Sequence, residues 1–255
     1  MSILIERPAS RDLIPAELMP VIAQVTNLYR QTFGLRLQSV YLLGSATRGE
    51  YRPGSSDFDV RAIVSEKREG EKERVDQLAE PLKNQFNIAK MELDVYTLDG
   101  LNKRDWLQFY VRVDGICVWG KPYEPTFPLP TSKEALAQML AFHLLEHYER
   151  MPETLKRIRV GSEQGEPEMW RTYAKRAMRL GNAISILKTG LYTQNSDRMV
   201  ENIIRHVLEI TEPIAILNQY RQFPPESLEG FIELASAAEK VRESVLRYGL
   251  KKKEE

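Results

Sequence analysis

The sequence has few residues of several informative kinds. Its 255 residues include one cysteine, Cys117, which excludes an internal disulfide and agrees with a reducing cytoplasm. No apolar run approaches the roughly 20 residues that a membrane-spanning helix needs. Glu6, Arg7 and Pro8 interrupt the first ten residues before a signal-like apolar core can form. We therefore expect a cytoplasmic protein that does not contact a membrane.

An excess of charge of either sign is also absent. Lysine and arginine total 36, and aspartate and glutamate total 36. Proteins that bind nucleic acid through its phosphates usually present a strongly basic surface, which this composition does not provide. The composition therefore argues against nucleic acid as a partner.

Against this background, two aspartates one residue apart follow a glycine-serine turn. Gly44 and Ser45 end a predicted apolar strand at 37–43, and Asp57 and Asp59 stand at the start of the next, at 58–64. Because side chains alternate between the faces of a strand, both carboxylates point the same way, while Phe58 points into a core. Two carboxylates about 7 Å apart on one face can share divalent cations.

The turn at Gly44 and Ser45 supplies groups that can bind an anion, which complement the cation-binding carboxylates. Gly44 lets a backbone N–H approach a ligand closely, and Ser45 is expected to cap a helix that follows it. Anions bind well at helix starts. A nucleoside triphosphate with bound Mg²⁺ needs both halves, since amides and hydroxyls bind its phosphates and carboxylates bind the metal.

A third acid is expected on the strand predicted at 88–96. Met91, Leu93 and Val95 alternate there with polar residues, so Glu92 and Asp94 share the face opposite the core. Either carboxylate could reach the metal site if this strand lies beside the one that carries Asp57 and Asp59. Three converging carboxylates suit a reaction that uses two metal ions.

Four short motifs together resemble the DNA polymerase beta-type nucleotidyltransferase superfamily. They are Gly44-Ser45, Arg48-Gly49, Ser56-Asp57-Phe58-Asp59 and Leu93-Asp94-Val95, and the similarity covers roughly residues 36–100. A catalytic domain followed by an all-helical domain is similar to the layout of the aminoglycoside nucleotidyltransferase (adenylyltransferase) group within this superfamily.

The resemblance implies a specific reaction and a set of residues for it. It implies that an acceptor hydroxyl attacks the α-phosphorus of ATP, or of another nucleoside triphosphate, and that pyrophosphate leaves. Two Mg²⁺ ions would be held by Asp57, Asp59 and a third acid, for which the family pattern favours Asp94, also the candidate proton acceptor. The implied nucleotide-binding residues of this region are Gly44, Ser45, Arg48 and Ser56.

Periodicity predicts an α/β domain followed by a helical bundle. In the first domain, placed at 1–122, we expect a small mixed sheet with strands at 37–43, 58–64, 88–96 and 115–119 and helices at 15–33, 69–86 and 98–112. Four prolines within residues 122–130 mark a linker. In the second domain, placed at 131–250, we expect helices at 133–160, 168–189, 196–217 and 225–248.

The predicted helix at 168–189 carries a basic ridge. Arg171, Lys175 and Arg179 recur every four residues, so they are either a solvated face or a contact for triphosphate, and Lys175 and Arg179 are candidate nucleotide-binding residues. In the drug-modifying relatives, a Thr-Gly turn after this helix is followed by a phosphate-binding lysine. Here Lys188-Thr189-Gly190 resembles the turn but no lysine follows, so Lys188 or Arg198 could substitute.

Several functions remain open at this stage. The acceptor implied by the resemblance is a small hydroxylated molecule, such as an aminoglycoside-like antibiotic. The alternatives are a protein or RNA acceptor, as in nucleotidyltransferases paired with toxins, and a catalytically silent nucleotide-binding module. The retained acids favour catalysis. His143 to His147 also match the short H-x-x-E-H pattern of a zinc site, although packed histidines are commoner in such apolar surroundings.

Overall fold

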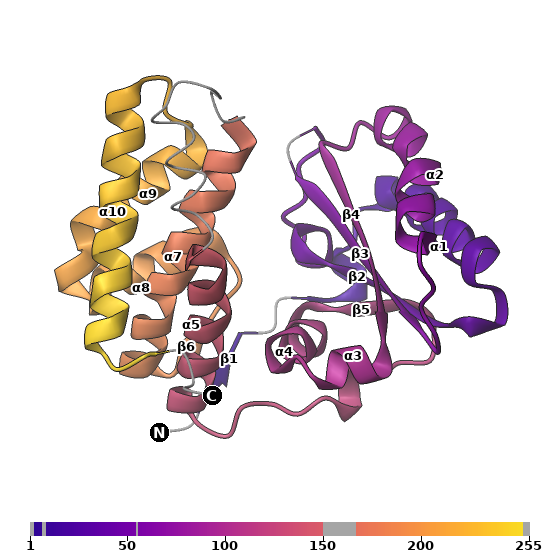
Figure 1. Ribbon diagram of the computed structural model, residues 1–255, viewed down its shortest axis with the longest axis horizontal. Helices are drawn as coiled ribbons and strands as arrows, with labels where there is room; N and C mark the ends of the chain where they lie inside the picture. The colour runs from indigo at the N-terminus through magenta and orange to yellow at the C-terminus, as the bar shows by residue number, and fades with distance from the viewer. Residues whose placement is uncertain (1–2, 7–8, 55, 150–166, 252–255) are drawn as a thin grey trace. The chain divides into compact units, whose positions relative to one another are not determined.

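The computed structural model describes residues 3–6, 9–54, 56–149 and 167–251 (Figure 1). These residues form two compact units. One unit spans Arg7–Leu129, and the other joins Met1–Glu6 to Pro130–Glu255.

The first unit is built on a four-stranded mixed sheet. The strands are β2 (Leu37–Leu43), β3 (Asp57–Val64), β4 (Lys90–Thr97) and β5 (Ile116–Gly120), in the order β4-β3-β2-β5. Strand β3 runs parallel to β4, whereas β2 is antiparallel to both β3 and β5. The predicted mixed sheet is confirmed. The bounds of β2 agree with the sequence prediction because its apolar run is closed on both sides by turn residues.

Helices cover the two faces of this sheet unequally. Helices α1 (Met19–Phe33) and α2 (Glu71–Gln85) pack on the face that buries Phe58 and Val60 (Figure 1). On the other face, α3 (Leu98–Asn102) and α4 (Asp105–Asp114) pack only near Tyr41 and Ile63. By the alternation along β3, Asp57 and Asp59 share the face of Ile63, at the opposite end of the strand. The acids therefore occupy the half of this face that α3 and α4 leave uncovered.

A buried tyrosine of α1 lies across the β3–β4 pair. The Tyr29 hydroxyl is 3.4 Å from the carbonyl oxygen of Val60 and 3.3 Å from that of Asp94. These carbonyls belong to neighbouring strands, so one phenol contacts both. The contact supports the register on which the placement of the acids depends.

The second unit is mainly helical, with α7 (Pro167–Thr189) packed against its other helices (Figure 1). These are α5 (Lys133–Glu149), α8 (Ser196–His206), α9 (Thr211–Gln222) and α10 (Leu228–Arg247). The apolar side chains of Trp170, Tyr173, Ala177 and Ile184 on α7 are buried. The helical character predicted for this part of the chain is confirmed, and no described helix is both long and apolar enough to cross a membrane.

Two predicted helices differ from the structure. The helix predicted at 98–112 is two helices, α3 and α4, and the helix predicted at 196–217 is α8 and α9. Pro213 explains the second break, because proline in a helix interior removes one hydrogen bond and clashes with the preceding turn. It is tolerated here in the first turn of α9. The end of the helix predicted at 133–160 lies outside the described residues.

A short strand pair was not predicted. Strand β1 (Leu4–Ile5) runs parallel to β6 (Leu191–Tyr192), with hydrogen bonds from the Leu4 amide to the Gly190 carbonyl (2.9 Å) and from the Glu6 amide to the Tyr192 carbonyl (3.0 Å). Glu6 also forms an ion pair with Arg198 of α8. The segment up to Glu6, which the sequence assigned to the first domain, therefore contacts the second unit.

Candidate active site

The glycine-serine turn lies directly against one of the aspartates. Residues Gly44–Thr47 form a single 3₁₀ turn after β2, with Gly44 at a φ of +78°. A Cβ atom at Gly44 would overlap the Asp59 carboxylate. Only glycine fits this position, both for its backbone angle and for the close approach of the carboxylate.

The turn does not lead into the helix that the sequence predicted. Its four residues are followed by Arg48, Gly49 and an extended segment, so Ser45 caps no helix and a helix-start anion site is not formed there. The Ser45 carbonyl instead accepts hydrogen bonds from the amides of Arg48 (3.2 Å) and Glu50 (3.0 Å). Its half-buried hydroxyl has no hydrogen-bond partner among the described residues and remains a candidate phosphate ligand.

The register of the parallel strands β3 and β4 decides which third acid lies beside the aspartates. Asp57 is paired with Lys90, Asp59 with Glu92, and Arg61 with Asp94. Glu92, rather than Asp94, is therefore the neighbour of Asp59. Asp94 lies two residues further along the strand, where its carboxylate accepts a hydrogen bond from the Tyr96 hydroxyl at 3.2 Å.

Asp57, Asp59, Glu92 and Lys90 form a cluster of charges on β3 and β4. Burial raises the pKa of Asp59, and the charges of Glu92 and Asp57 raise it further, against the effect of Arg61. Burial also raises the pKa of Glu92, but the hydrogen bond and charge of Lys90 and the hydrogen bond with Asp59 lower it overall. The two shifts have opposite signs because Asp59 is the more buried carboxyl and Glu92 has the ammonium group of Lys90 beside it. Lys90 favours the charged form of Glu92.

The donor set fits a divalent cation by its chemistry. Carboxylate oxygens are the ligands that Mg²⁺ prefers, and a cation would relieve the repulsion that raises the pKa of Asp59. Within the described part of the chain, no three His, Cys, Asp or Glu side chains are already arranged as a metal site. Glu92 is instead paired with the ammonium group of Lys90.

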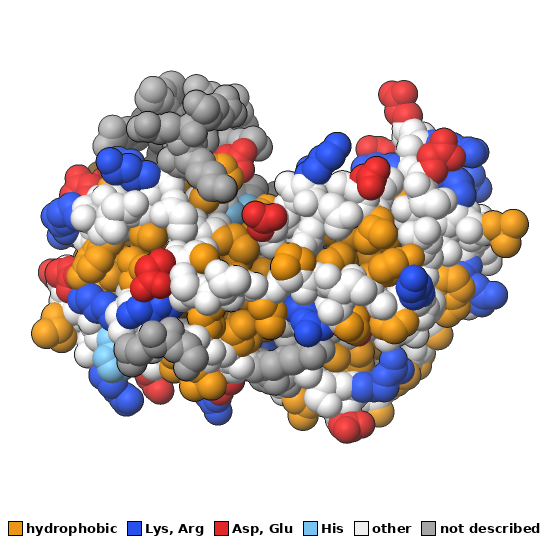
Figure 2. Space-filling model, turned by 90° about the horizontal axis from the view of Figure 1, so that it is seen from below, with side chains coloured by type: hydrophobic (Ala, Val, Ile, Leu, Met, Phe, Trp, Pro, Cys, Tyr) orange, Lys and Arg blue, Asp and Glu red, His pale blue; other side chains and the backbone are white. Residues whose placement is uncertain are grey.

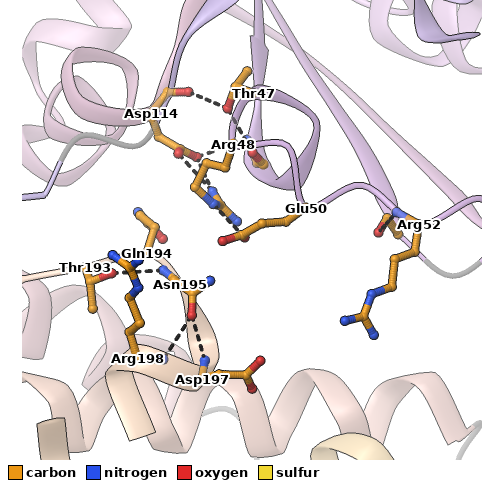
Figure 3. A network of polar contacts seen from close by, with 12 residues as sticks. Thr47, Arg48, Glu50, Arg52, Asp114, Thr193, Gln194, Asn195, Asp197 and Arg198 are labelled. Carbon is orange, nitrogen blue, oxygen red and sulfur yellow. Dashed lines mark hydrogen bonds and ion pairs between the residues drawn. The ribbon is translucent and has the colours of Figure 1, made fainter. Parts of the chain in front are cut away.

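Arg48, predicted to bind the nucleotide, is held inside the protein (Figure 3). Its guanidinium donates to both carboxylate oxygens of Asp114, at 2.8 and 2.9 Å, and to Glu50 at 3.0 Å. Its side chain is 10% exposed and that of Asp114 is 5% exposed. The Arg48 guanidinium therefore helps to hold the turn in place, and its predicted contact with a nucleotide stays a prediction.

Asp114 is a positioning residue that sequence reasoning missed. Besides binding Arg48, its carboxylate accepts a hydrogen bond from the Gly44 amide at 2.9 Å, and its carbonyl accepts one from the Thr47 hydroxyl at 3.1 Å. Asp114 thus contacts three residues of the turn segment. One signal was available in the sequence, since an acid at the C-terminus of a helix is unfavourable for the helix dipole unless it has another partner.

The other predicted nucleotide-binding residues occupy varied positions. The Ser56 hydroxyl accepts a hydrogen bond from the Arg52 amide at 2.8 Å and closes the loop before β3. Lys175 and Arg179 are partly exposed on α7 in the second unit, and their role stays a prediction. Of the zinc pattern, His143 and Glu146 lie on α5, while the side chain of His147 lies outside the described residues.

Comparison with known proteins assigns the first unit. Residues 27–114 match the nucleotidyltransferase domain family, and this range contains the turn, all four acids of β3 and β4, and Asp114. The chain therefore carries a nucleotidyltransferase domain, as the sequence predicted. No curated protein sequence matches the chain.

Among solved structures, the chain is similar to spectinomycin adenyltransferase AAD(9) from Enterococcus faecialis, solved with ATP and spectinomycin. The identity is 13%, the TM-score is 0.61, and the match covers 87% of this chain and 98% of that one. This likeness shows a shared fold. A toxin–antitoxin structure with AMP-PNP matches 53% of this chain and 97% of its own, at 19% identity and a TM-score of 0.33.

Proposed function

We propose that the protein transfers a nucleoside monophosphate, AMP from ATP, to a hydroxyl group of a small molecule and releases pyrophosphate. The observation that supports this proposal is the alignment of Asp57, Asp59 and Glu92 on adjacent parallel strands beside the Gly44 turn. The fold shared with an adenyltransferase solved with ATP and spectinomycin makes an aminoglycoside-like antibiotic the acceptor class to test first. Since ATP is the donor, we place the reaction in the cytoplasm.

The three acids take distinct roles in this proposal. Asp57, Asp59 and Glu92 would hold two Mg²⁺ ions, which when bound would supply charge stabilisation for the triphosphate and the departing pyrophosphate. Glu92 accepts the proton of the acceptor hydroxyl. The acceptor oxygen then forms a bond to the α-phosphorus, the bond from that phosphorus to the bridging oxygen breaks, and pyrophosphate leaves with the electron pair.

The turn positions the triphosphate relative to the acids. The Ser45 hydroxyl is available for a phosphate oxygen. Asp114 and Arg48 fix the backbone of the turn, so that it need not reorganise when the substrate binds, an arrangement that lowers the cost of reaching the transition state. Lys175 and Arg179 are proposed to contact the triphosphate from the helical unit, where they form part of a basic ridge.

Pyrophosphate release provides the test. The protein is incubated with each of the four labelled triphosphates, Mg²⁺ and a panel of hydroxylated acceptors that includes aminoglycosides. We expect transfer from ATP to one acceptor class. Asp57→Asn and Asp59→Asn should each abolish transfer, because each removes a carboxylate charge from the metal site.

A matched control comes from the same unit. Asp76 of α2 forms an exposed ion pair with Lys72 and is not among the carboxylates paired across β3 and β4, so Asp76→Asn should retain full activity. Activity kept in either site variant would overturn the assignment of the acids. Transfer only to a protein or RNA would replace the small-molecule acceptor, and no transfer with any acceptor would favour a silent nucleotide-binding module.

A further inference from the structure

Lys90 occupies a distinctive position at the start of the edge strand β4. It is paired in register with Asp57, and its ammonium group forms an ion pair with Glu92 two residues along the same face. The side chains of Lys90 and Glu92 are 48% and 40% exposed. A lysine therefore contacts the acid that lies beside Asp59 and is itself aligned with Asp57.

The charge balance of the cluster explains this contact. Asp57, Asp59 and Glu92 place three carboxyls on one face of two neighbouring strands, and burial together with their mutual repulsion raises the pKa of Asp59. Burial opposes the charged form of Lys90, but its hydrogen bond with Glu92 and the charges of Glu92, Asp57 and Asp59 raise its pKa overall. The Lys90 ammonium group is thus the positive charge that β4 supplies to these three carboxyls.

The same contact restricts Glu92. A carboxylate oxygen that binds an ammonium group cannot at the same time bind a metal ion at full strength, and the positive charge repels an approaching cation. The side chain of lysine is long and flexible, and about half of this one is exposed. Its ammonium group can therefore move away into solvent when a stronger cation arrives.

We propose that Lys90 is a built-in counter-ion that competes with divalent cations for Glu92 and so sets the cation concentration at which the site fills. This inference rests on the proposed function, because it assumes that the three acids bind a divalent metal. Lys90 is a positioning residue in this scheme. It acts through Glu92 and makes no contact with the reacting atoms.

The groove beside β4 provides a matched comparison. It has a volume of about 480 Å³ and is lined by Lys90 and Glu92 from β4 and by Lys83 and Glu80 from α2. Lys83 forms an ion pair with Glu80 at 3.0 Å. Lys83→Met therefore removes a similar ion pair from the same groove without touching the carboxylates of β3 and β4.

Binding of Mn²⁺ in the absence of nucleotide tests the proposal without a catalytic readout. Free Mn²⁺ is measured by electron paramagnetic resonance during titration of the full chain. Lys90→Met should bind Mn²⁺ roughly 2- to 5-fold more tightly than the wild type, the range expected for loss of a partly exposed ion pair. Lys90→Arg should stay near the wild type, and Lys83→Met should not change the affinity.

A second variant and a double variant separate competition from a general structural effect. Lys90→Gln, checked for folding by circular dichroism, should reproduce the effect of Lys90→Met. In a Glu92→Gln background, Lys90→Met should no longer increase the affinity for Mn²⁺, because the lysine acts through the Glu92 carboxylate.

The possible failures are distinguishable. In one outcome, the wild type binds Mn²⁺, Asp59→Asn does not, and Lys90→Met binds with the affinity of the wild type. That outcome would support the proposed metal site and overturn the role of Lys90. A wild-type protein that binds no Mn²⁺, together with a Lys90→Met variant that also binds none, would overturn both proposals.

Discussion

The Asp59 carboxylate packs against the α-carbon of Gly44, so the turn after β2 and the acid of β3 occupy one shared space. Gly44 also has a positive φ of +78°. The backbone angle of Gly44 and its missing side chain are therefore both required, and the turn cannot change without moving the acid.

Gly44→Ala should abolish activity and destabilise the protein by more than about 1 kcal/mol, because the new methyl group overlaps Asp59 and the positive φ strains an alanine backbone. Gly70 offers a control, since its φ is +77° and nothing lies within 4 Å of its added Cβ. Gly70→Ala should show backbone strain alone and keep its activity. Urea unfolding and pyrophosphate release measure the two effects. Near-normal transfer by Gly44→Ala would contradict the proposed tight contact.

The two candidate third acids should respond differently to neutralisation. Glu92→Gln should lower the turnover number by about 10²- to 10⁴-fold, the usual contribution of a general base. Asp94→Asn should lower it less than about 10-fold by the same scale, because the position of Asp94 is in register with Arg61 rather than with an aspartate, and its carboxylate accepts a hydrogen bond from the Tyr96 hydroxyl. Single-turnover transfer of labelled AMP measures both rates. The reverse ranking would restore Asp94 as the third acid.

Asp59→Asn should stabilise the protein at alkaline pH while it abolishes transfer. The folded-state pKa of Asp59 is raised above its unfolded value, so folding favours the protonated acid. The resulting stability is complete below the unfolded pKa of about 3.9. It is then lost as the pH rises through the folded pKa.

Thermal unfolding in a chelating buffer at pH 5 and pH 8 measures this effect. The wild type should lose more stability between these pH values than Asp59→Asn. Asp76→Asn serves as the control, because this exposed acid pairs with Lys72 on α2 and should follow the wild type. Parallel pH profiles for the wild type and Asp59→Asn would show that burial and the neighbouring acids do not raise this pKa.

Asp114→Ala should destabilise the protein by about 3–5 kcal/mol, because it leaves the buried guanidinium of Arg48 without its main partner. Glu50→Gln removes only the more exposed partner of Arg48 and should cost less than about 1 kcal/mol. In the milder variant Asp114→Asn, the KM for the triphosphate should rise more than the turnover number falls, since the turn is displaced while the acids remain. A purely structural role would instead lower the fraction of active enzyme and leave KM unchanged.

The sequence predicted the parts of the site that depend on local pattern. Alternation along β3 placed Asp57 and Asp59 on one face, and Gly44 marked the turn. The third acid could not be chosen in this way, because Glu92 and Asp94 share a face of β4 and only the register with β3 separates them. That register depends on pairing between distant segments and on packing against α1.

The role of Arg48 was missed for a related reason. Its partner Asp114 lies 66 positions away in the sequence, and nothing in the local pattern connects the two. The ion pair with Asp114 therefore had no signal in the sequence around Arg48, and the nucleotide contact of Arg48 stays a prediction beside it. The same limitation hid the pairing of the two-residue strands β1 and β6.

The pairing of β1 with β6 has a consequence for how such enzymes can exchange parts. The backbone passes between the two units twice, once after Glu6 and once near Pro130. A recombination event at the proline-rich linker alone would deliver a helical unit without the strand that covers β6. Exchange of the helical unit by recombination would therefore also require exchange of the residues that form β1, because they complete the strand pair with β6.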